Sequence, residues 1–247
     1  MVKTFKVLSA LLCYPTEELQ ASVGELYATL NIEGLVAAAE RRRLGVLLRQ
    51  LENRPLLELQ ERYVFLFDRT RSLSLQLFEH IHGESRDRGQ AMVDLLELYR
   101  RHGLELDARE LPDYLPLFLE FLSTRPLDEA RELLSQPLHI LVALGKRLRR
   151  RKSPYAAVFE ALARLTEAEP AQADLQTLLD LPEDDPDDLQ ALDSIWEEEA
   201  VSFGPGANAA DANGCNKAAE LVVRMNTGVD PSPLRGANLG ERQWPNT

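Results

Sequence analysis

The chain has little cysteine: two residues, Cys13 and Cys215, among 247. Two thiols so far apart in sequence form neither a disulfide framework nor a four-ligand zinc site. Cys13 lies in an apolar segment without an adjacent cation to lower its pKa, so we expect a small core residue and not a nucleophile. This cysteine usage is typical of a reducing compartment, and the sequence predicts a cytoplasmic protein.

Long hydrophobic runs are also missing. No apolar run reaches the roughly 18 residues that a membrane-spanning helix requires. The run from Val7 to Cys13 follows Lys3 and Lys6, but it is short for a signal peptide and no A-x-A-like cleavage site comes after it. A lipoprotein site would need a small residue where Leu12 stands. We therefore expect neither export nor direct membrane insertion.

Motifs that carry catalysis or bind phosphate are absent. The sequence contains no G-x-G-x-x-G, no G-x-x-x-x-G-K-[ST] and no G-x-S-x-G. Residues 79–84 combine metal-ligand types, but H-E-x-x-H spacing is absent, and residues two apart on a helix point about 200° from each other. We predict no catalytic residue, no metal and no cofactor. A metal-dependent hydrolase remains an alternative, with its ligands drawn from Glu79, His80, His82 and Glu84.

Cations are outnumbered by acids, 28 to 40, which gives a formal net charge of −12. Such a surface repels phosphate backbones, so nucleic acid is a poor partner. The one dense basic run, Lys146–Lys152, has no interleaved aromatics and is typical of a solvated helix end. From Leu165 to Asn216 there is no Lys or Arg, while five acids fall within residues 183–188. Pairing of the basic run with this acidic segment, or with a partner, stays open.

The periodicity of apolar residues predicts an all-α fold, because helical spacing recurs along the chain and no alternating β pattern is evident. We expect a single helical bundle over residues 1–168. An acidic linker with a short helix near 189–200 follows at 169–203, and residues 204–247 are predicted to be a mostly disordered tail. Thr16 and Pro55 should begin helices, Gly103 should end one, and Pro137 should divide the tract 126–152.

The bundle is predicted to be organised around the helix at residues 113–122. Asp113 is a plausible N-cap, and Pro116 falls in the first turn, where its missing amide costs little. Seven apolar side chains cover an arc of roughly 200°: Tyr114, Leu115, Leu117, Phe118, Leu119, Phe121 and Leu122. An arc this wide belongs either to a central core helix or to a helix that also walls a peptide groove, with Asp113 and Glu120 on its rim.

The stretch from Glu79 to Gln90 gathers charged residues around glycines between two predicted helices. The charged side chains are Glu79, Glu84, Arg86, Asp87 and Arg88. Ion pairs that fix the helix junction are the simpler interpretation. A rim that holds a bound segment is the alternative.

Two of these stretches resemble the signatures of the NarJ-type nitrate reductase assembly chaperones, the delta subunit family. They are FEHIHGESRDRGQAM at 78–92 and ELPDYLPLFLEFL at 110–122. Three shorter pieces agree: LSALLCYP at 8–15, ERYVFLFD at 61–68 and WEEEAVSF at 196–203. Sister families that serve other molybdoenzymes and bind twin-arginine leaders carry His where this chain has Tyr114, so the resemblance favours the nitrate reductase branch.

The resemblance implies an all-helical cytoplasmic chaperone and not an enzyme. Its partner would be the apo catalytic subunit of membrane nitrate reductase, bound partly through the N-terminal peptide of that subunit. The chaperone would keep this client competent for insertion of the molybdenum cofactor and delay its membrane attachment. A chaperone of another molybdoenzyme and a generic acidic scaffold are the competing interpretations.

An amphipathic client helix would need an apolar groove with several buried anchors. We expect the groove to be lined by Tyr63, Phe67, Tyr114, Leu117, Phe118 and Phe121. Asp113 and Glu120 are predicted to pair with a cation of the peptide. Glu79, Glu84, Arg86 and Arg88 are predicted to fix the adjoining helix junction.

Overall fold

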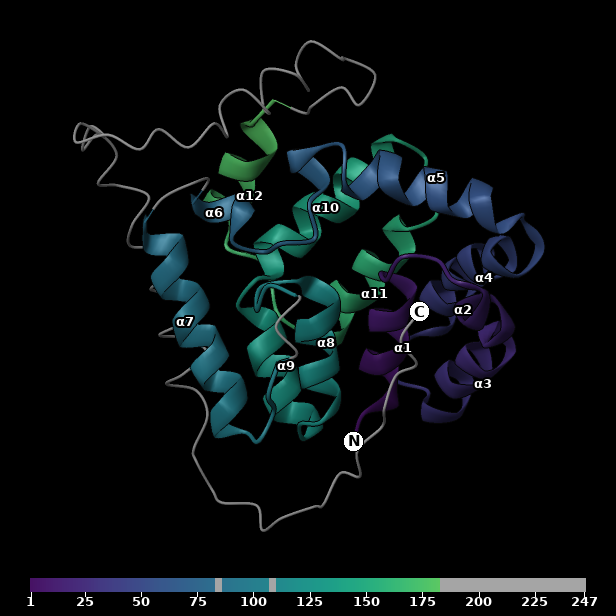
Figure 1. Ribbon diagram of the computed structural model, residues 1–247, viewed down its shortest axis with the longest axis horizontal. Coiled ribbons are helices and arrows are strands. Elements are labelled where there is room, and N and C mark those ends of the chain that lie inside the picture. Colours follow the sequence, from purple (N-terminus) through teal and green to yellow (C-terminus); the bar gives the residue numbers. More distant parts are fainter. Residues whose placement is uncertain (83–85, 107–109, 183–247) are drawn as a thin grey trace.

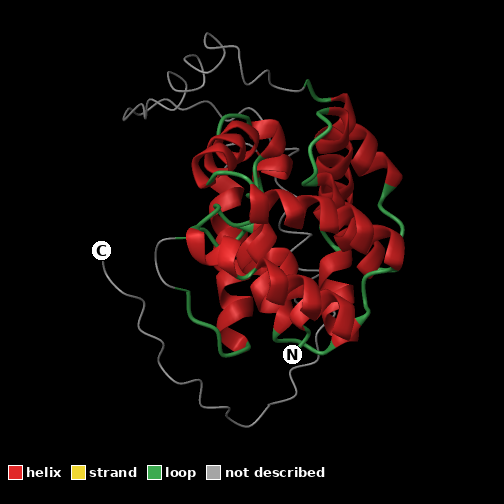
Figure 2. Cartoon of the chain, turned by 90° about the vertical axis from the view of Figure 1, so that its right-hand side faces the viewer, coloured by secondary structure: helices red, strands yellow, loops and turns green. Residues whose placement is uncertain are grey.

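The computed structural model describes residues 1–82, 86–106 and 110–182 (Figure 1). Over these ranges the chain consists of helices and loops, without a β-strand (Figure 2). The predicted all-α class is confirmed. The predictions for residues 183–247, which include the short helix at 189–200 and the tail, concern residues outside the described ranges.

Five helices form the N-terminal part of the bundle, on the right-hand side of Figure 1. They are α1 (Lys3–Leu11), α2 (Glu17–Ala21), α3 (Val23–Glu33), α4 (Ala38–Asn53) and α5 (Leu56–Phe67). The Thr16 hydroxyl accepts a hydrogen bond from the Leu19 amide at 3.2 Å, so it caps α2 as predicted. Pro55 directly precedes α5, also as predicted.

The remaining elements follow a short 3-10 helix, η1 (Arg71–Leu73). They are α6 (Glu79–His82), α7 (Arg86–Arg101), α8 (Leu115–Ser123), α9 (Leu127–Ser135), α10 (Leu138–Arg150), α11 (Ala156–Leu165) and α12 (Gln172–Asp180). Pro137 separates α9 from α10, as expected. Gly103 adopts a φ of +76° just after α7, a conformation that favours glycine and ends the helix.

Helix α1 lies at the centre of the N-terminal half and packs against α8 and α3. Phe5, Leu8 and Leu11 on α1 are completely buried. The carboxylate of Glu33, at the end of α3, accepts hydrogen bonds from the amides of Lys3 and Thr4 at 2.8 and 2.7 Å. This distant acid therefore satisfies the open end of α1, where no local side chain caps the helix.

The other half is built on the antiparallel pair α10 and α11, with α4 against α11 and α12 against α10. The buried Arg147 guanidinium of α10 donates to the Ser72 carbonyl at 2.7 Å and to the Leu178 carbonyl of α12 at 2.5 Å. Leu175 and Leu178 of α12 are buried. The helical domain thus extends past the predicted boundary at 168, and residues 172–180 are part of it and not of a linker.

Residues 73–81 do not form one continuous helix, although Leu73, Leu77 and Ile81 have helical spacing. After η1 the chain runs beside residues 113–115: the Leu115 amide donates to the Leu75 carbonyl at 2.8 Å, and the Leu77 amide to the Asp113 carbonyl at 3.0 Å. These hydrogen bonds to a distant segment, and not a local burial pattern, set the conformation here.

Candidate functional site

The predicted site residues converge on the place where the end of α1, helix α5 and the start of α8 meet. The Tyr63 hydroxyl of α5 donates to the Leu12 carbonyl at 2.8 Å and lies 3.2 Å from the Tyr114 hydroxyl. Burial raises the pKa of Tyr63 above its ordinary value and that of Tyr114 to about 12, so both phenols stay neutral. Tyr63 thereby links three segments that are far apart in sequence.

Tyr63 and Phe67 are core residues here. Their ring centroids are 5.0 Å apart, and Phe67 packs edge-on against Tyr155 at 5.1 Å. Both are at most 5% exposed, and Phe118 and Phe121 of α8 are at most 2% exposed. These four predicted groove residues are buried in the core and do not form a surface.

The surface above this core is an apolar strip that we call the α8 face: Cys13, Tyr14, Tyr114 and Leu117. Tyr14 is 45% exposed and stacks edge-on against Tyr63 with a centroid distance of 5.6 Å. Tyr114 and Leu117 are half-buried and three residues apart, so they lie on one side of α8. Glu120 follows Leu117 by three residues and lies on the same side of α8.

Carboxylates surround the α8 face. Burial, followed by the charges of Glu120 and Glu110, raises the pKa of the Cys13 thiol to about 11. Burial raises the pKa of Tyr114, and the charges of Glu110 and Asp68 raise it further, despite the hydrogen bond with Tyr63. Lys6 of α1 pairs with Glu120 at the surface. The α8 face is therefore an apolar strip in a negative potential, which favours an apolar segment that also carries a cation.

Asp113 does not lie on a rim, and it does not cap α8. Tyr114 occupies the N-cap position, where no side chain forms a capping bond. Asp113 is completely buried, and its carboxylate accepts a hydrogen bond from the Phe78 amide at 3.0 Å. The sequence-based expectation failed because the carboxylate satisfies the backbone of another segment and not the first turn of its own helix.

The expected ion-pair junction is present in part. Arg88 of α7 contacts Glu79 of α6 at 3.2 Å, and both side chains are mostly shielded from solvent. Glu84 and the Arg86 side chain lie outside the described residues. The Glu79–Arg88 pair lies close enough to the buried Asp113 for both charges to act on the pKa of its carboxyl group.

Nothing in the described part of the chain resembles a metal centre. Over these residues, no three His, Cys, Asp or Glu side chains are grouped so as to hold a metal ion. His80 is half-buried, with Nε2 2.8 Å from the Ser74 carbonyl, and desolvation lowers its pKa. The described helices also include none with the length and hydropathy to cross a membrane.

Four residues of the site were not predicted: Cys13, Tyr14, Asp68 and Glu110. Cys13 and Tyr14 follow α1, Asp68 directly follows Phe67, and Glu110 precedes Tyr114 by four residues. Only the meeting of α1, α5 and the start of α8 brings these residues together.

The described residues form an all-helical bundle that carries an acid-edged apolar strip. The fold is similar to that of a putative redox enzyme maturation protein from Archaeoglobus fulgidus, with a TM-score of 0.50 and 24% identity over 68% of this chain and 94% of that one. The family model described as nitrate reductase delta subunit matches residues 17–161. The chain belongs to this nitrate reductase delta subunit family.

Two curated relatives come from Escherichia coli K12. One is the nitrate reductase molybdenum cofactor assembly chaperone NarJ, 44% identical over 198 residues, which cover 80% of this chain and 83% of NarJ. The other is NarW, described as a probable nitrate reductase molybdenum cofactor assembly chaperone, 42% identical over 217 residues, with 87% and 90% covered.

Proposed function

We propose that this chain is a cytoplasmic assembly chaperone of respiratory nitrate reductase and acts without catalysis. It binds the apo catalytic subunit, in part through the N-terminal peptide of that subunit. It keeps this client competent for molybdenum cofactor insertion and delays membrane attachment until then. The observation that carries the proposal is 44% identity to the NarJ assembly chaperone over 80% of the chain.

The α8 face is proposed as the docking surface for the client peptide. Leu117 and Tyr114 provide apolar area, which stabilises a bound amphipathic helix by roughly 25 cal/mol per Å². Glu110, Glu120 and Asp68 provide the negative potential for a Lys or Arg of the peptide. The buried residues Tyr63, Phe67, Phe118 and Phe121 hold this surface in place.

Pull-down tests the function. Tagged full-length chain, expressed in nitrate-grown cells, should retain one large molybdoenzyme subunit that lacks cofactor. Retention of a different molybdoenzyme would point to a sister role, and the absence of any molybdoenzyme would contradict the proposal.

Calorimetry with the N-terminal peptide of the client tests the docking surface. Leu117→Glu places a charge at the centre of the α8 face, and we expect at least a tenfold loss of affinity. Ile32→Glu is the matched control, because Ile32 is 84% exposed on α3. Equal affinities of wild type and the Leu117→Glu variant would rule out this surface.

The acidic border has its own test. Glu110→Gln together with Glu120→Gln should weaken peptide binding and reduce its salt dependence, because exposed charge interactions are screened by salt. Glu25→Gln with Glu132→Gln removes the same charge from exposed positions on α3 and α9. Equal effects of the two pairs would show that only net charge matters.

A further inference from the structure

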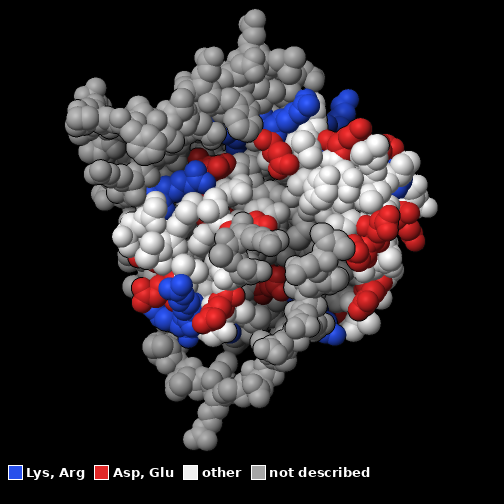
Figure 3. Space-filling model, viewed as in Figure 1, with Lys and Arg blue, Asp and Glu red and all other residues white. Residues whose placement is uncertain are grey.

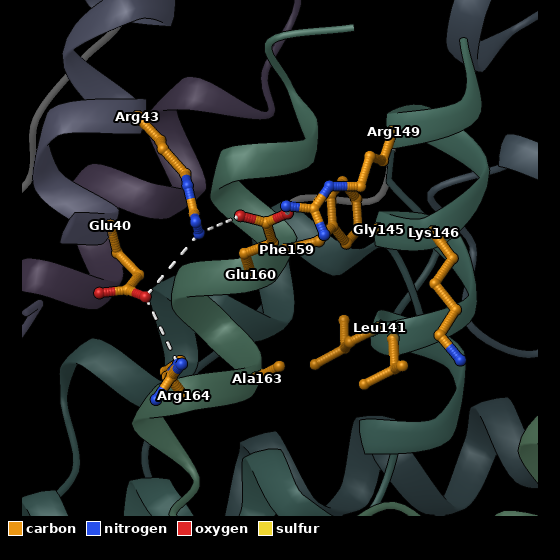
Figure 4. Close-up of a pocket in the computed structure, with 11 residues that line it drawn as sticks. Glu40, Arg43, Leu141, Gly145, Lys146, Arg149, Phe159, Glu160, Ala163 and Arg164 are labelled. Carbon is orange, nitrogen blue, oxygen red and sulfur yellow. Dashed lines mark hydrogen bonds and ion pairs between the residues drawn. The ribbon is translucent and has the colours of Figure 1, made fainter. Parts of the chain in front are cut away.

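A pocket of about 370 Å³ opens where α4, α10 and α11 meet (Figure 4). It is distinct from the α8 face and shares no residue with it. Its apolar wall consists of Leu141, Val142 and Gly145 of α10 and Phe159 and Ala163 of α11. The two helices approach each other closely here: a Cβ added at Gly145 would lie 3.2 Å from the Phe159 Cβ. The side chains of α10 and α11 therefore form one wall.

The rim of the pocket is charged and carries an excess of cations. Its ionisable side chains are Glu40, Arg43, Lys146, Arg149, Glu160 and Arg164. Four cations against two carboxylates leave a formal charge of +2, in a chain whose total is −12. In Figure 3 acidic side chains gather on the right-hand side, over the N-terminal helices.

The two carboxylates of the rim are shared among three arginines. Glu160 contacts Arg43 at 2.8 Å and Arg149 at 3.1 Å. Glu40, only 5% exposed, lies 3.4 Å from Arg164 and 3.9 Å from Arg43. Among the described residues, none offers Lys146 a carboxylate within ion-pair distance. The rim therefore has cationic capacity left for an anionic ligand.

The cationic groups are also accessible. The side chains of Arg43, Arg149 and Arg164 are 51%, 66% and 76% exposed. Arginine forms paired hydrogen bonds with carboxylates, which suits recognition of Asp and Glu side chains. An apolar wall beneath a ring of guanidinium groups fits a peptide segment better than a single small ion.

The sequence contains a segment with matching charge. Five of the six residues 183–188 are acidic. The segment begins three residues after the end of α12. Helix α12 is held against α10 by the hydrogen bond from Arg147 to the Leu178 carbonyl. Six extended residues span roughly 20 Å, about twice the diameter of a helix. A chain of this length that leaves α12, which packs against α10, is long enough to pass one helix.

We propose that the α4/α10/α11 pocket is a binding site for an acidic peptide segment, and that residues 183–188 of the same chain are its occupant. Each exposed ion pair contributes little, because solvent screens it and the long side chains lose freedom. The covalent tether raises the effective concentration of the segment to roughly the millimolar range. The association is accordingly reversible and weakened by salt.

A peptide spanning residues 181–190, added in trans, tests this assignment. The recipient is full-length chain with the acids of 183–188 neutralised by Glu183→Gln, Asp184→Asn, Asp185→Asn, Asp187→Asn and Asp188→Asn. At low salt we expect this recipient to bind the peptide and to show amide shifts at Gly145 and Ala163 in NMR spectra. Wild-type chain should bind the peptide at least tenfold more weakly, because its own segment occupies the pocket.

Matched charge variants show whether the pocket is responsible. On the neutralised background, Lys146→Gln with Arg149→Gln should reduce peptide affinity at least fivefold. Arg100→Gln with Arg101→Gln removes the same charge from the last turn of α7 and should leave affinity unchanged.

Three results would overturn the proposal. Wild-type and neutralised chains could bind the peptide equally well, the neutralised chain could fail to bind it, or the two charge pairs could have equal effects. Inorganic phosphate is the remaining probe: phosphate shifts at Gly145 without peptide binding would assign the pocket to a small anion and refute the peptide occupant.

Discussion

The carboxylate of Asp113 accepts a hydrogen bond from the Phe78 amide over 3.0 Å, between two segments 35 residues apart. The Asp113 carbonyl also accepts from the Leu77 amide, so one residue joins the start of α8 to the chain before α6. Burial raises the pKa of Asp113 above its usual range, while the Phe78 amide and the Arg88 charge act in the opposite direction. Protonation of the Asp113 carboxylate therefore makes this contact between residues 77–78 and the start of α8 sensitive to pH.

The first prediction concerns the pH dependence of stability. Between the ordinary Asp pKa and the raised one, the unfolded chain releases a proton that the folded protein retains, so Asp113 lowers the free energy of unfolding as pH rises. The Asp113→Asn variant lacks this titration. Urea unfolding at several pH values should show wild type losing stability relative to the variant as pH rises through this window. Parallel pH profiles would contradict the prediction.

The second prediction concerns the hydroxyl of Tyr63. Tyr63→Phe removes the bond to the Leu12 carbonyl and the contact with Tyr114 while it keeps the ring. We expect the free energy of unfolding to fall by about 1 to 2 kcal/mol, because a buried carbonyl loses its partner. Tyr27→Phe, at a tyrosine that is 46% exposed on α3, is the control for urea unfolding. Equal stability of the two variants would show that the Tyr63 hydroxyl contributes nothing.

The third prediction compares two helical glycines. Alanine normally stabilises a helix relative to glycine by about 1 kcal/mol. At Gly145 the added Cβ would meet the Phe159 Cβ at 3.2 Å, and that atom moves only with α11, so we expect Gly145→Ala to destabilise the protein by about 1 kcal/mol. At Gly89 of α7 nothing lies within 4 Å, and Gly89→Ala should stabilise. Thermal unfolding of both variants checks the opposite signs.

The fourth prediction concerns thiol reactivity. Burial and the nearby carboxylates raise the pKa of Cys13 from 9.0 to about 11, which lowers the thiolate population at neutral pH roughly a hundredfold. In a Cys215→Ser variant, we expect a maleimide or disulfide reagent to label folded Cys13 roughly a hundred times more slowly than the unfolded chain. Comparable rates in the two states would show that the thiol is neither shielded nor perturbed.

Local sequence determined some of the helix ends. Thr16 has a hydroxyl within reach of its own first turn, Pro55 fits the position before a helix, and Gly103 tolerates a positive φ. Such effects act over three or four residues and need no partner. The all-α class followed from the helical spacing of apolar residues, which is also a local signal.

Asp113 had an equally good local signal, and it was misleading. Its carboxylate had two possible uses, and only packing placed the Phe78 amide within 3.0 Å. The segment with Leu75 and Leu77 likewise depends on hydrogen bonds to residues 113–115, which a local pattern does not reveal. Segment 172–180 looked like a linker because its attachment is made by Arg147, 31 residues away from Leu178.

The helical fold and the membership of the nitrate reductase delta subunit family are both readable from the amino-acid sequence, since local propensities and a shared sequence pattern suffice for them. Which aromatic residues are buried and which are exposed depends instead on how the helices pack. Tyr63 and Tyr14 have similar chemistry, but one is 4% and the other 45% exposed. The reason is that burial depends on contacts among α1, α5 and α8, which no single segment encodes.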